Sequence, residues 1–203
     1  MVVDLGCGAG VWLEAALRAG YRTAGCDQSR SLVALARKAV PASAIAVASV
    51  DAYRIPVCQA VTSLGEVLGY RAPAGAVAGL QRIARRAWTS LSLGGLFLFD
   101  VMVTARGNPL SYRTWTAGPD WAVLAVVREE AGGRGLVREI TTFRKIGARY
   151  RRSDETHRVT LFDPREVAAA LREAGFSVRV RRGYGRDRLP SRRLAFIARK
   201  TRR

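Results

Sequence analysis

A short apolar segment that runs into alternating glycines opens the chain, and it constrains the fold more than any other stretch. Residues 2–5 read Val-Val-Asp-Leu, and glycines follow at positions 6, 8 and 10. Residues 11–19 then carry apolar side chains at helical spacing. Glycines let a backbone turn sharply and approach a ligand closely, and a helix that follows presents free N–H groups at its start. The segment therefore predicts a strand, a nucleotide-binding turn and a helix.

A second acidic residue, at the end of the next strand, supports a nucleotide site. Residues 21–26 favour a short strand that leads into Asp27. In dinucleotide-binding folds, an acid at this position accepts hydrogen bonds from the ribose hydroxyls. The dinucleotide fingerprint is Gly-x-Gly-x-x-Gly, however, and Val11 stands where its third glycine is required. A nicotinamide-dependent oxidoreductase is therefore the less favoured alternative for this turn.

Helices and strands alternate over most of the remaining chain. The predicted helices cover residues 30–39, 76–93 and 164–174. Ser29 and Asp163 are the expected N-caps of the first and the last of them, and Gly94-Gly95 is expected to end the second. The predicted strands cover residues 44–50, 58–64, 96–103, 176–180 and 194–198.

Residues 104–160 break this alternation. Residues 104–120 are rich in glycine and proline and are expected to form turns. Three strand-like segments follow with no helix between them, at residues 121–128, 136–146 and 148–161. They predict an antiparallel β-rich insert within a single domain that spans residues 1–203.

The pattern Asp-x-Gly-x-Gly-x-Gly at residues 4–10, together with Asp27, resembles the first two motifs of class I S-adenosylmethionine-dependent methyltransferases, of the small-molecule type. The passage from the 76–93 helix through two glycines to Leu-Phe-Leu-Phe-Asp at 96–100 resembles the family's approach to its fifth strand. The resemblance runs from residue 2 to about residue 200. Residues 104–160 are its least specific part.

The resemblance implies an α/β fold: a Rossmann-like, seven-stranded, mostly parallel sheet with helices on both faces, an antiparallel last strand and the insert after the fifth strand. It also implies an enzyme that transfers a methyl group from S-adenosyl-L-methionine. Family members usually carry one or two helices before the first strand. Here the predicted strand begins at residue 2, so the expectation is either a fragment of a longer chain or an unusually open site.

The resemblance also assigns cofactor-binding positions. Asp4 and the glycines of the turn would hold the methionine portion, Asp27 the ribose and Asp51 the adenine amino group, with Ala52 near the ring edge. The alternative for Asp51 is a turn residue before Pro56. The cofactor-binding residues expected in this way are Asp4, Gly6, Cys7, Gly8, Gly10, Asp27, Gln28, Asp51, Ala52 and Leu64.

Three residues are candidate catalytic residues that would contact the methyl acceptor. Glu66 and Tyr70 follow the predicted fourth strand, whose carboxyl end would face the methyl group. His157 lies in the insert and could take a proton from the acceptor. The alternatives are a surface glutamate, a packing tyrosine and a histidine that donates an N–H to a carbonyl. Asp100 either faces the acceptor or caps a loop.

The acceptor is expected to be a small molecule. The segment after the fourth predicted strand lacks the Asp/Asn-Pro-Pro-Tyr/Phe of amino-methylating nucleic-acid enzymes, and no Pro-Cys or Thr-Cys nucleophile precedes it. The net charge is +18, and residues 144–203 hold 19 arginines and lysines against 6 acids. Arginines of the insert could hold an anionic acceptor. The alternatives are an RNA-directed methyltransferase or a nucleic-acid-binding module that uses this basic surface, or a merely solvated, arginine-rich face.

The composition indicates which compartment, membrane attachment and metal content to expect. No signal segment opens the chain, and its longest apolar stretch, residues 93–103, is too short to span a membrane. Three cysteines lie in or beside apolar strand candidates, which favours buried, reduced thiols in a cytoplasmic protein. His157 is the single histidine, so no metal-ligand pattern is present and no metal site is expected.

Overall fold

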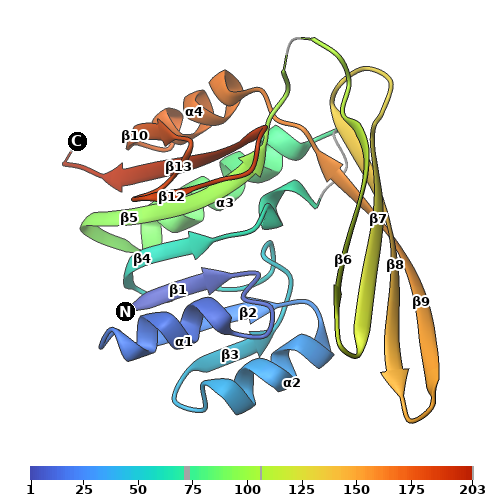
Figure 1. The fold of residues 1–203 in the computed structure, drawn as a ribbon. Coiled ribbons are helices and arrows are strands. Elements are labelled where there is room, and N and C mark those ends of the chain that lie inside the picture. Colours follow the sequence, from blue (N-terminus) through green and yellow to red (C-terminus); the bar gives the residue numbers. More distant parts are fainter. Residues whose placement is uncertain (71–73, 106, 203) are drawn as a thin grey trace.

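A seven-stranded sheet with helices on both faces stands beside a four-stranded antiparallel sheet in the computed structural model, which describes residues 1–70, 74–105 and 107–202 (Figure 1). The order of the large sheet is β10-β13-β5-β4-β1-β2-β3, and only β13 runs antiparallel to its neighbours. Its strands are β1 (Val2–Leu5), β2 (Thr23–Asp27), β3 (Ala44–Val47), β4 (Cys58–Ser63), β5 (Leu91–Met102), β10 (Phe176–Arg181) and β13 (Arg193–Lys200). The predicted fold class is confirmed.

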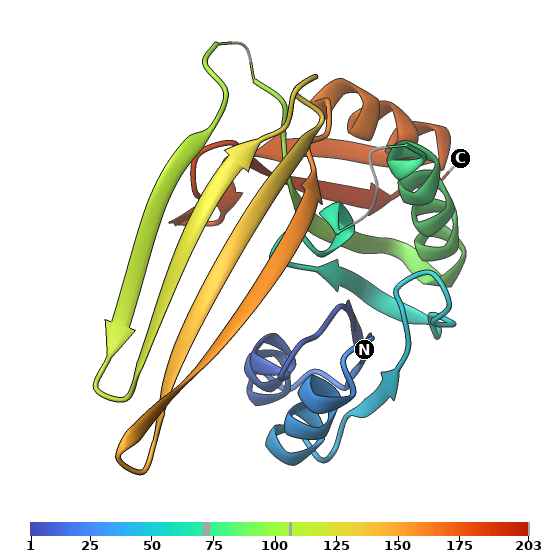
Figure 2. The same ribbon diagram turned by 90° about the vertical axis from the view of Figure 1, so that its right-hand side faces the viewer.

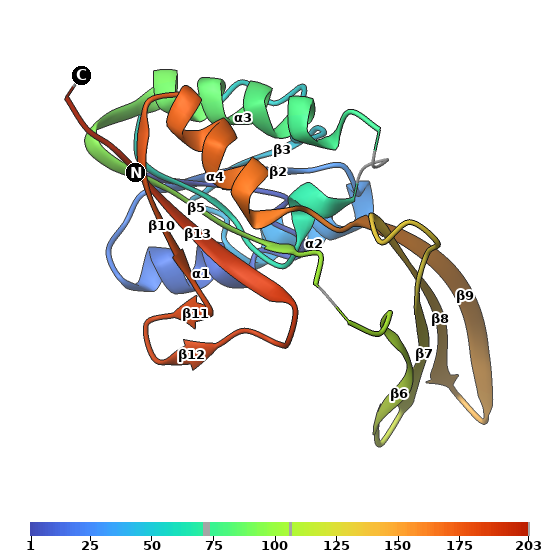
Figure 3. The same ribbon diagram turned by 90° about the horizontal axis from the view of Figure 1, so that it is seen from above.

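Four helices cover the two faces of this sheet (Figure 3). The helices α1 (Val11–Arg18) and α2 (Arg30–Ala39) lie on one face, and α3 (Ala76–Ser90) and α4 (Pro164–Glu173) lie on the other. The Ser29 hydroxyl accepts a hydrogen bond from the N–H of Leu32, and the Asp163 carboxylate accepts one from the N–H of Arg165. Both predicted N-caps are therefore confirmed.

The main core lies between the sheet and the α3–α4 pair. Phe97 and Phe99 of β5 are fully buried there, together with Leu80 and Ile83 of α3 and Leu171 of α4. A smaller cluster on the other face joins α1 and α2 to the sheet. Leu96 and Leu98, which alternate with the two phenylalanines along β5, point to the other face and are only partly buried.

The three cysteines belong to these clusters. Cys7, Cys26 and Cys58 are buried free thiols, as expected from the sequence. Burial raises the pKa of Cys58 to about 11, so its thiol stays protonated at neutral pH.

The insert is a four-stranded antiparallel meander (Figure 2). Its strands are β6 (Ser111–Gly118), β7 (Trp121–Glu129), β8 (Gly135–Ile146) and β9 (Arg149–Thr160). The strand β6 corrects the sequence analysis, which expected turns throughout residues 104–120. Turn residues flank β6 on both sides, but Tyr112, Thr114 and Trp115 suit a strand, and a two-residue loop pairs Gly118 with Trp121.

A second correction concerns the two glycines after α3. The helix ends at Ser90, and Gly94 and Gly95 lie inside β5 rather than at the end of the helix. The pairing of β4 with β5 shifts register between Cys58 and Ala60, and a Cβ on Gly95 would lie 2.8 Å from the Gln59 carbonyl oxygen. The glycines therefore permit an irregular strand, not a helix stop.

The loop between β10 and β13 also contains structure that the sequence did not indicate. Two short strands, β11 (Gly183–Tyr184) and β12 (Asp187–Arg188), form a hairpin there.

A 3₁₀ turn, η1 (Val67–Gly69), follows β4. No helix within the described ranges has the length and apolar character needed to cross a membrane.

Candidate functional site

A cavity of about 520 Å³ lies at the carboxyl ends of β1, β2 and β3, between α2 and the insert. Ligands of open α/β sheets lie outside these strand ends. The lining residues come from the loops after the three strands, from η1 and its flank, and from β9. They are Gly6, Asp27, Gln28, Ser29, Leu32, Ser49, Val50, Asp51, Val67, Tyr70, Thr156, His157 and Arg158.

The glycine turn contributes Gly6 to the wall of this cavity. Gly6, Gly8 and Gly10 have φ angles of 79°, 54° and 88°, which L side chains rarely adopt. A Cβ on Gly6 would lie 2.4 Å from a methyl carbon of Val67, and one on Gly10 would lie 3.1 Å from the Ala36 Cβ. A Cβ on Gly8 would meet no atom within 4 Å. The turn therefore packs tightly at its two ends and leaves open space at its centre.

Asp27 connects the glycine turn to the loop that precedes α2. Its Oδ2 accepts a hydrogen bond of 2.9 Å from the N–H of Gly8, and its Oδ1 accepts one of 2.9 Å from the N–H of Ser29. Each carboxylate oxygen can still accept a further hydrogen bond. Asp27 thus shapes the wall and keeps acceptor capacity for a ligand in the cavity.

Asp4 lies beneath the turn and does not line the cavity. It is buried, and its Oδ1 accepts a hydrogen bond of 2.5 Å from the Thr62 hydroxyl. The Trp12 indole N–H donates to the same hydroxyl at 3.0 Å. Burial raises the pKa of Asp4 to about 7, and the Thr62 hydrogen bond only partly opposes this shift. The three side chains join β1, β4 and α1 under the glycine turn.

The structure brings together only part of the predicted site. Of the predicted residues, the cavity is lined by Gly6, Asp27, Gln28, Asp51, Tyr70 and His157. The predicted residues that do not line it are Asp4, Cys7, Gly8, Gly10, Ala52, Leu64 and Glu66. The N–H of Ala52 donates a hydrogen bond of 3.1 Å to the Ser49 carbonyl oxygen.

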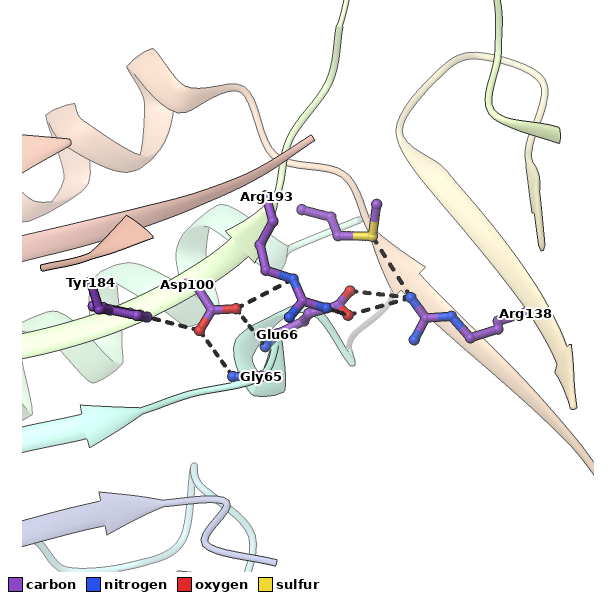
Figure 4. A network of polar contacts seen from close by, with 7 residues as sticks. Gly65, Glu66, Asp100, Arg138, Tyr184 and Arg193 are labelled. Atoms are coloured by element: carbon purple, nitrogen blue, oxygen red, sulfur yellow. Dashed lines mark hydrogen bonds and ion pairs between the residues drawn. The ribbon is translucent and has the colours of Figure 1, made fainter. Parts of the chain in front are cut away.

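Glu66 is held in a buried network away from the cavity (Figure 4). Its φ of 64° is left-handed, and its carboxylate forms ion pairs with Arg138 of β8, at 3.4 Å, and with Arg193 of β13. Its backbone N–H donates to Asp100 Oδ2 at 3.1 Å. The side chain is therefore committed to joining the insert to the large sheet.

Asp100 of β5 is the centre of the same network (Figure 4). It accepts hydrogen bonds from the N–H groups of Gly65 and Glu66, at 2.9 and 3.1 Å, and from the Tyr184 hydroxyl at 3.2 Å. The guanidinium of Arg193 lies 3.6 Å from its other side. Burial and the Asp100 charge raise the pKa of Tyr184 above its ordinary value. Asp100 caps the loop after β4, which is the second of the two roles considered from the sequence.

Tyr70 and His157 meet at the insert side of the cavity. Their rings pack edge to face, with centroids 5.6 Å apart. His157 Nε2 lies 3.0 Å from a carboxylate oxygen of Glu155, and its Nδ1 is shielded from solvent without a partner among the described residues. If Nε2 donates to Glu155, Nδ1 is the nitrogen that carries the free lone pair.

Several residues of this region had no signal in the sequence. Arg138 is 72 residues from Glu66, and only the pairing of β8 with β9 brings it to the core. Val67 lines the cavity because η1 turns it against Gly6. Strand alternation in β8 could have placed Arg138 on the inner face, but not against Glu66. Within the residues that the structure describes, no group of histidine, cysteine and acidic side chains could hold a metal ion.

Comparison with known families agrees with this geometry. Residues 2–87 match the family model described as a methyltransferase domain. This match covers the N-terminal part of the chain, which therefore resembles a methyltransferase domain. The match covers the glycine turn, Asp27, Asp51 and the segment through α3, so it contains the large-sheet side of the cavity. No curated protein sequence matches this chain.

Solved structures resemble the chain over almost its whole length. One is an amino pentose methyltransferase of calicheamicin biosynthesis from Micromonospora echinaspora, with a TM-score of 0.80, 21% identity and coverage of 98% of this chain and 83% of that chain. A sugar N-methyltransferase from Streptoalloteichus has a TM-score of 0.80 at 22% identity, over 99% and 80% of the two chains. An S-adenosylmethionine-dependent methyltransferase from Clostridium acetobutylicum has a TM-score of 0.80 at 16% identity, over 98% and 83%. The shared fold includes the insert.

Proposed function

We propose that this chain is an S-adenosylmethionine-dependent methyltransferase whose acceptor is a small molecule bound between the large sheet and the insert. One observation carries the proposal. Gly6 of the glycine turn lines a single cavity with Asp27 and Asp51, and β9 of the insert closes its other side through Thr156, His157 and Arg158. The resemblance to sugar and amino pentose methyltransferases supports a small-molecule acceptor.

The residues present fit an adenosyl group. Ribose hydroxyls and the adenine amino group are hydrogen-bond donors, and Asp27 and Asp51 supply carboxylates on the wall of the cavity. Leu32, Val50 and Val67 supply apolar surface for a ring. The open space at Gly8 leaves room for a ligand against the backbone. We therefore assign Asp27 to the ribose, Asp51 to the adenine and the glycine turn to the methionine portion.

The residues of this chain have to align the acceptor with the methyl group of the cofactor. Bound S-adenosylmethionine supplies a methyl group on a sulfonium, which is already activated for transfer. Alignment of the reacting groups can account for several kcal/mol, up to about 7–11 in ideal cases. Tyr70 and His157 border the cavity and would orient the acceptor and exclude water there.

His157 is the residue best suited to receive a proton. Its contact with Glu155 fixes one ring nitrogen as the donor, which leaves Nδ1 as an acceptor. We assign Glu66 no contact with the acceptor, because two arginines occupy its carboxylate. Its role is to position the loop after β4.

Calorimetric titration with S-adenosylhomocysteine, with NADH as a parallel titrant, tests the proposal. S-adenosylhomocysteine, the product of methyl transfer from the cofactor, should bind with a dissociation constant in the micromolar range, which corresponds to about −8 kcal/mol. NADH should give no heat of binding. Binding of NADH alone, or of neither compound to a chain whose fold is verified by circular dichroism, would overturn the proposed function.

A further inference from the structure

The face of the insert that is turned toward the large sheet carries an ordered set of side chains. Residues directly opposite each other in an antiparallel pair point to the same face. Arg138 is paired with His157, Thr142 with Ser153, and Arg144 with Arg151. Arg138 contacts Glu66 and His157 lines the cavity, so this inner face is the one that meets the core.

The far end of this inner face is strongly basic. Arg144 and Arg151 are directly opposite each other, and Arg149 follows on the same face two residues along β9. All three side chains are exposed, and none forms an ion pair with a described carboxylate. Like charges directly opposite each other destabilise a sheet. The three arginines, which we call the inner arginine group, therefore lack an internal partner.

Five other arginines of the insert form ion pairs, whereas Arg113 of β6 forms none with a described carboxylate; the five are Arg128, Arg134, Arg138, Arg152 and Arg158. On the outer face, Arg128 contacts Glu139 at 2.5 Å and Arg152 contacts Asp154 at 3.0 Å. The row next to the inner arginine group offers two hydroxyls, Thr142 and Ser153, and no acid. The acid of this inner face, Glu155, is paired with Ile140 two rows farther along, and its carboxylate contacts His157 at 3.0 Å. The inner arginine group is therefore a cluster of three positive charges with no described carboxylate in contact with it.

The separation between the inner arginine group and the cavity determines how long a molecule must be to reach both. Six residues of β9 separate Arg151 from His157, which corresponds to about 20 Å at the rise of a strand. The β8–β9 hairpin extends along the side of the molecule where α2 lies (Figure 2). A molecule with one end beside His157 could therefore reach the inner arginine group with its other end.

We propose that the inner arginine group binds a phosphate of the acceptor molecule, at the end remote from the atom that is methylated. This deepens the proposed function and rests on it. Three guanidinium groups offer more parallel N–H pairs than the two oxygens of one carboxylate can accept, whereas a phosphate group presents more oxygens. Arginine favours such bidentate contacts with phosphate. The acceptor class is thus an elongated small molecule with a phosphate at the end remote from the methyl group.

Binding of inorganic pyrophosphate to the full chain, saturated with S-adenosylhomocysteine at physiological ionic strength, tests this site. The wild-type chain should bind pyrophosphate while S-adenosylhomocysteine is bound, because the two sites are far apart. The double variant Arg144→Gln/Arg151→Gln should weaken pyrophosphate binding by about tenfold or more, since each charged hydrogen-bonding group contributes strongly. Its affinity for S-adenosylhomocysteine should not change.

The matched control is the double variant Lys145→Gln/Arg152→Gln, which removes the same charge from the outer face of the same hairpin. It should change pyrophosphate affinity by less than about threefold. Equal losses in the two double variants would show general charge attraction and overturn the proposal. Absence of pyrophosphate binding to the wild-type chain would overturn it as well. Failure of S-adenosylhomocysteine to bind would instead contradict the proposed function, because that titration is made separately.

Discussion

Asp27 both holds the glycine turn in place and lines the candidate cavity. Its carboxylate accepts the N–H groups of Gly8 and Ser29, so it holds the glycine turn against the start of α2. The glycine turn and Asp27 could be identified from the sequence because their spacing is local and their geometry requires glycine at positive φ. The contact between Asp27 and the N–H of Gly8 could not, since nothing in the sequence specifies which donor faces the carboxylate.

Substitution of Asp27 tests its role in binding. Asp27→Ala should weaken S-adenosylhomocysteine by about 1–3 kcal/mol, because the ribose hydroxyls lose an ionised acceptor. Asp27→Asn, which keeps an acceptor for one backbone N–H, should lose less. Calorimetry measures both, with Asp187→Asn on the exposed β12 as the control. Unchanged affinity in a folded Asp27→Ala variant would remove Asp27 from the site.

Asp4 is expected to make stability depend on pH. Its carboxyl pKa is about 7 when folded and 3.8 in the reference state. Between these values the unfolded chain ionises first, so the free energy of unfolding falls as pH rises from about 4 to 7. The fall should be at most about 4 kcal/mol, from the shift at about 1.36 kcal/mol for each pH unit.

The variant Asp4→Asn cannot ionise and should lack this fall. Urea unfolding at pH 5 and pH 8 would compare it with the wild-type chain. The variant should gain stability relative to wild type as pH rises across this range, and the difference should be constant above about pH 7. A difference that is the same at pH 5 and pH 8 would show that Asp4 is ionised at both.

At the scale of elements, two buried ion pairs attach the insert to the large sheet. Arg138 of β8 reaches Glu66, and Glu129 of β7 forms a bidentate pair with Arg192, which precedes β13, at 2.6 and 3.3 Å. The hydrogen bonds from Arg192 lower the pKa of Glu129. Both pairs join residues that are distant in sequence. They fix the insert beside the cavity, where β9 can contribute His157.

Removal of the Glu66 carboxylate should loosen this attachment. Glu66→Gln leaves Arg138 and Arg193 without their acid in a buried position, so the free energy of unfolding should fall by about 3 kcal/mol. The control is Glu139→Gln, whose pair with Arg128 is exposed and should contribute about 0–1 kcal/mol. Urea unfolding of the two variants makes the comparison. Equal, small losses would mean that the Glu66 network does not hold the insert.

Helices and strands whose signals lie within a few residues could be predicted from the sequence, and those that depend on pairing with another strand could not. Ser29 and Asp163 predicted helix starts correctly because a cap acts within three residues. The strand β6 was missed because turn residues flank it and its pairing with β7 depends on the loop that joins them. Gly94 and Gly95 were misassigned because a helix stop and an irregular strand use the same residue type.

At the scale of the whole molecule, part of the C-terminal positive charge lies inside the fold. Arg192 and Arg193 are paired with Glu129 and Glu66, and Lys200 donates to the backbone carbonyls of Trp88 and Leu91. The net charge of +18 therefore does not describe a single basic surface. The proposed arrangement is a cofactor cavity on the large sheet, an insert that closes it, and an inner arginine group at the far end of that insert.

A crystal structure of the chain with S-adenosylhomocysteine tests the central claim most directly. The ligand should lie in the cavity between α2 and β9, with its ribose hydroxyls within hydrogen-bond distance of Asp27 and its adenine beside Asp51. Its sulfur should point toward Tyr70 and His157. A ligand bound elsewhere, such as against the open sheet surface near Leu96 and Arg199, would contradict the account.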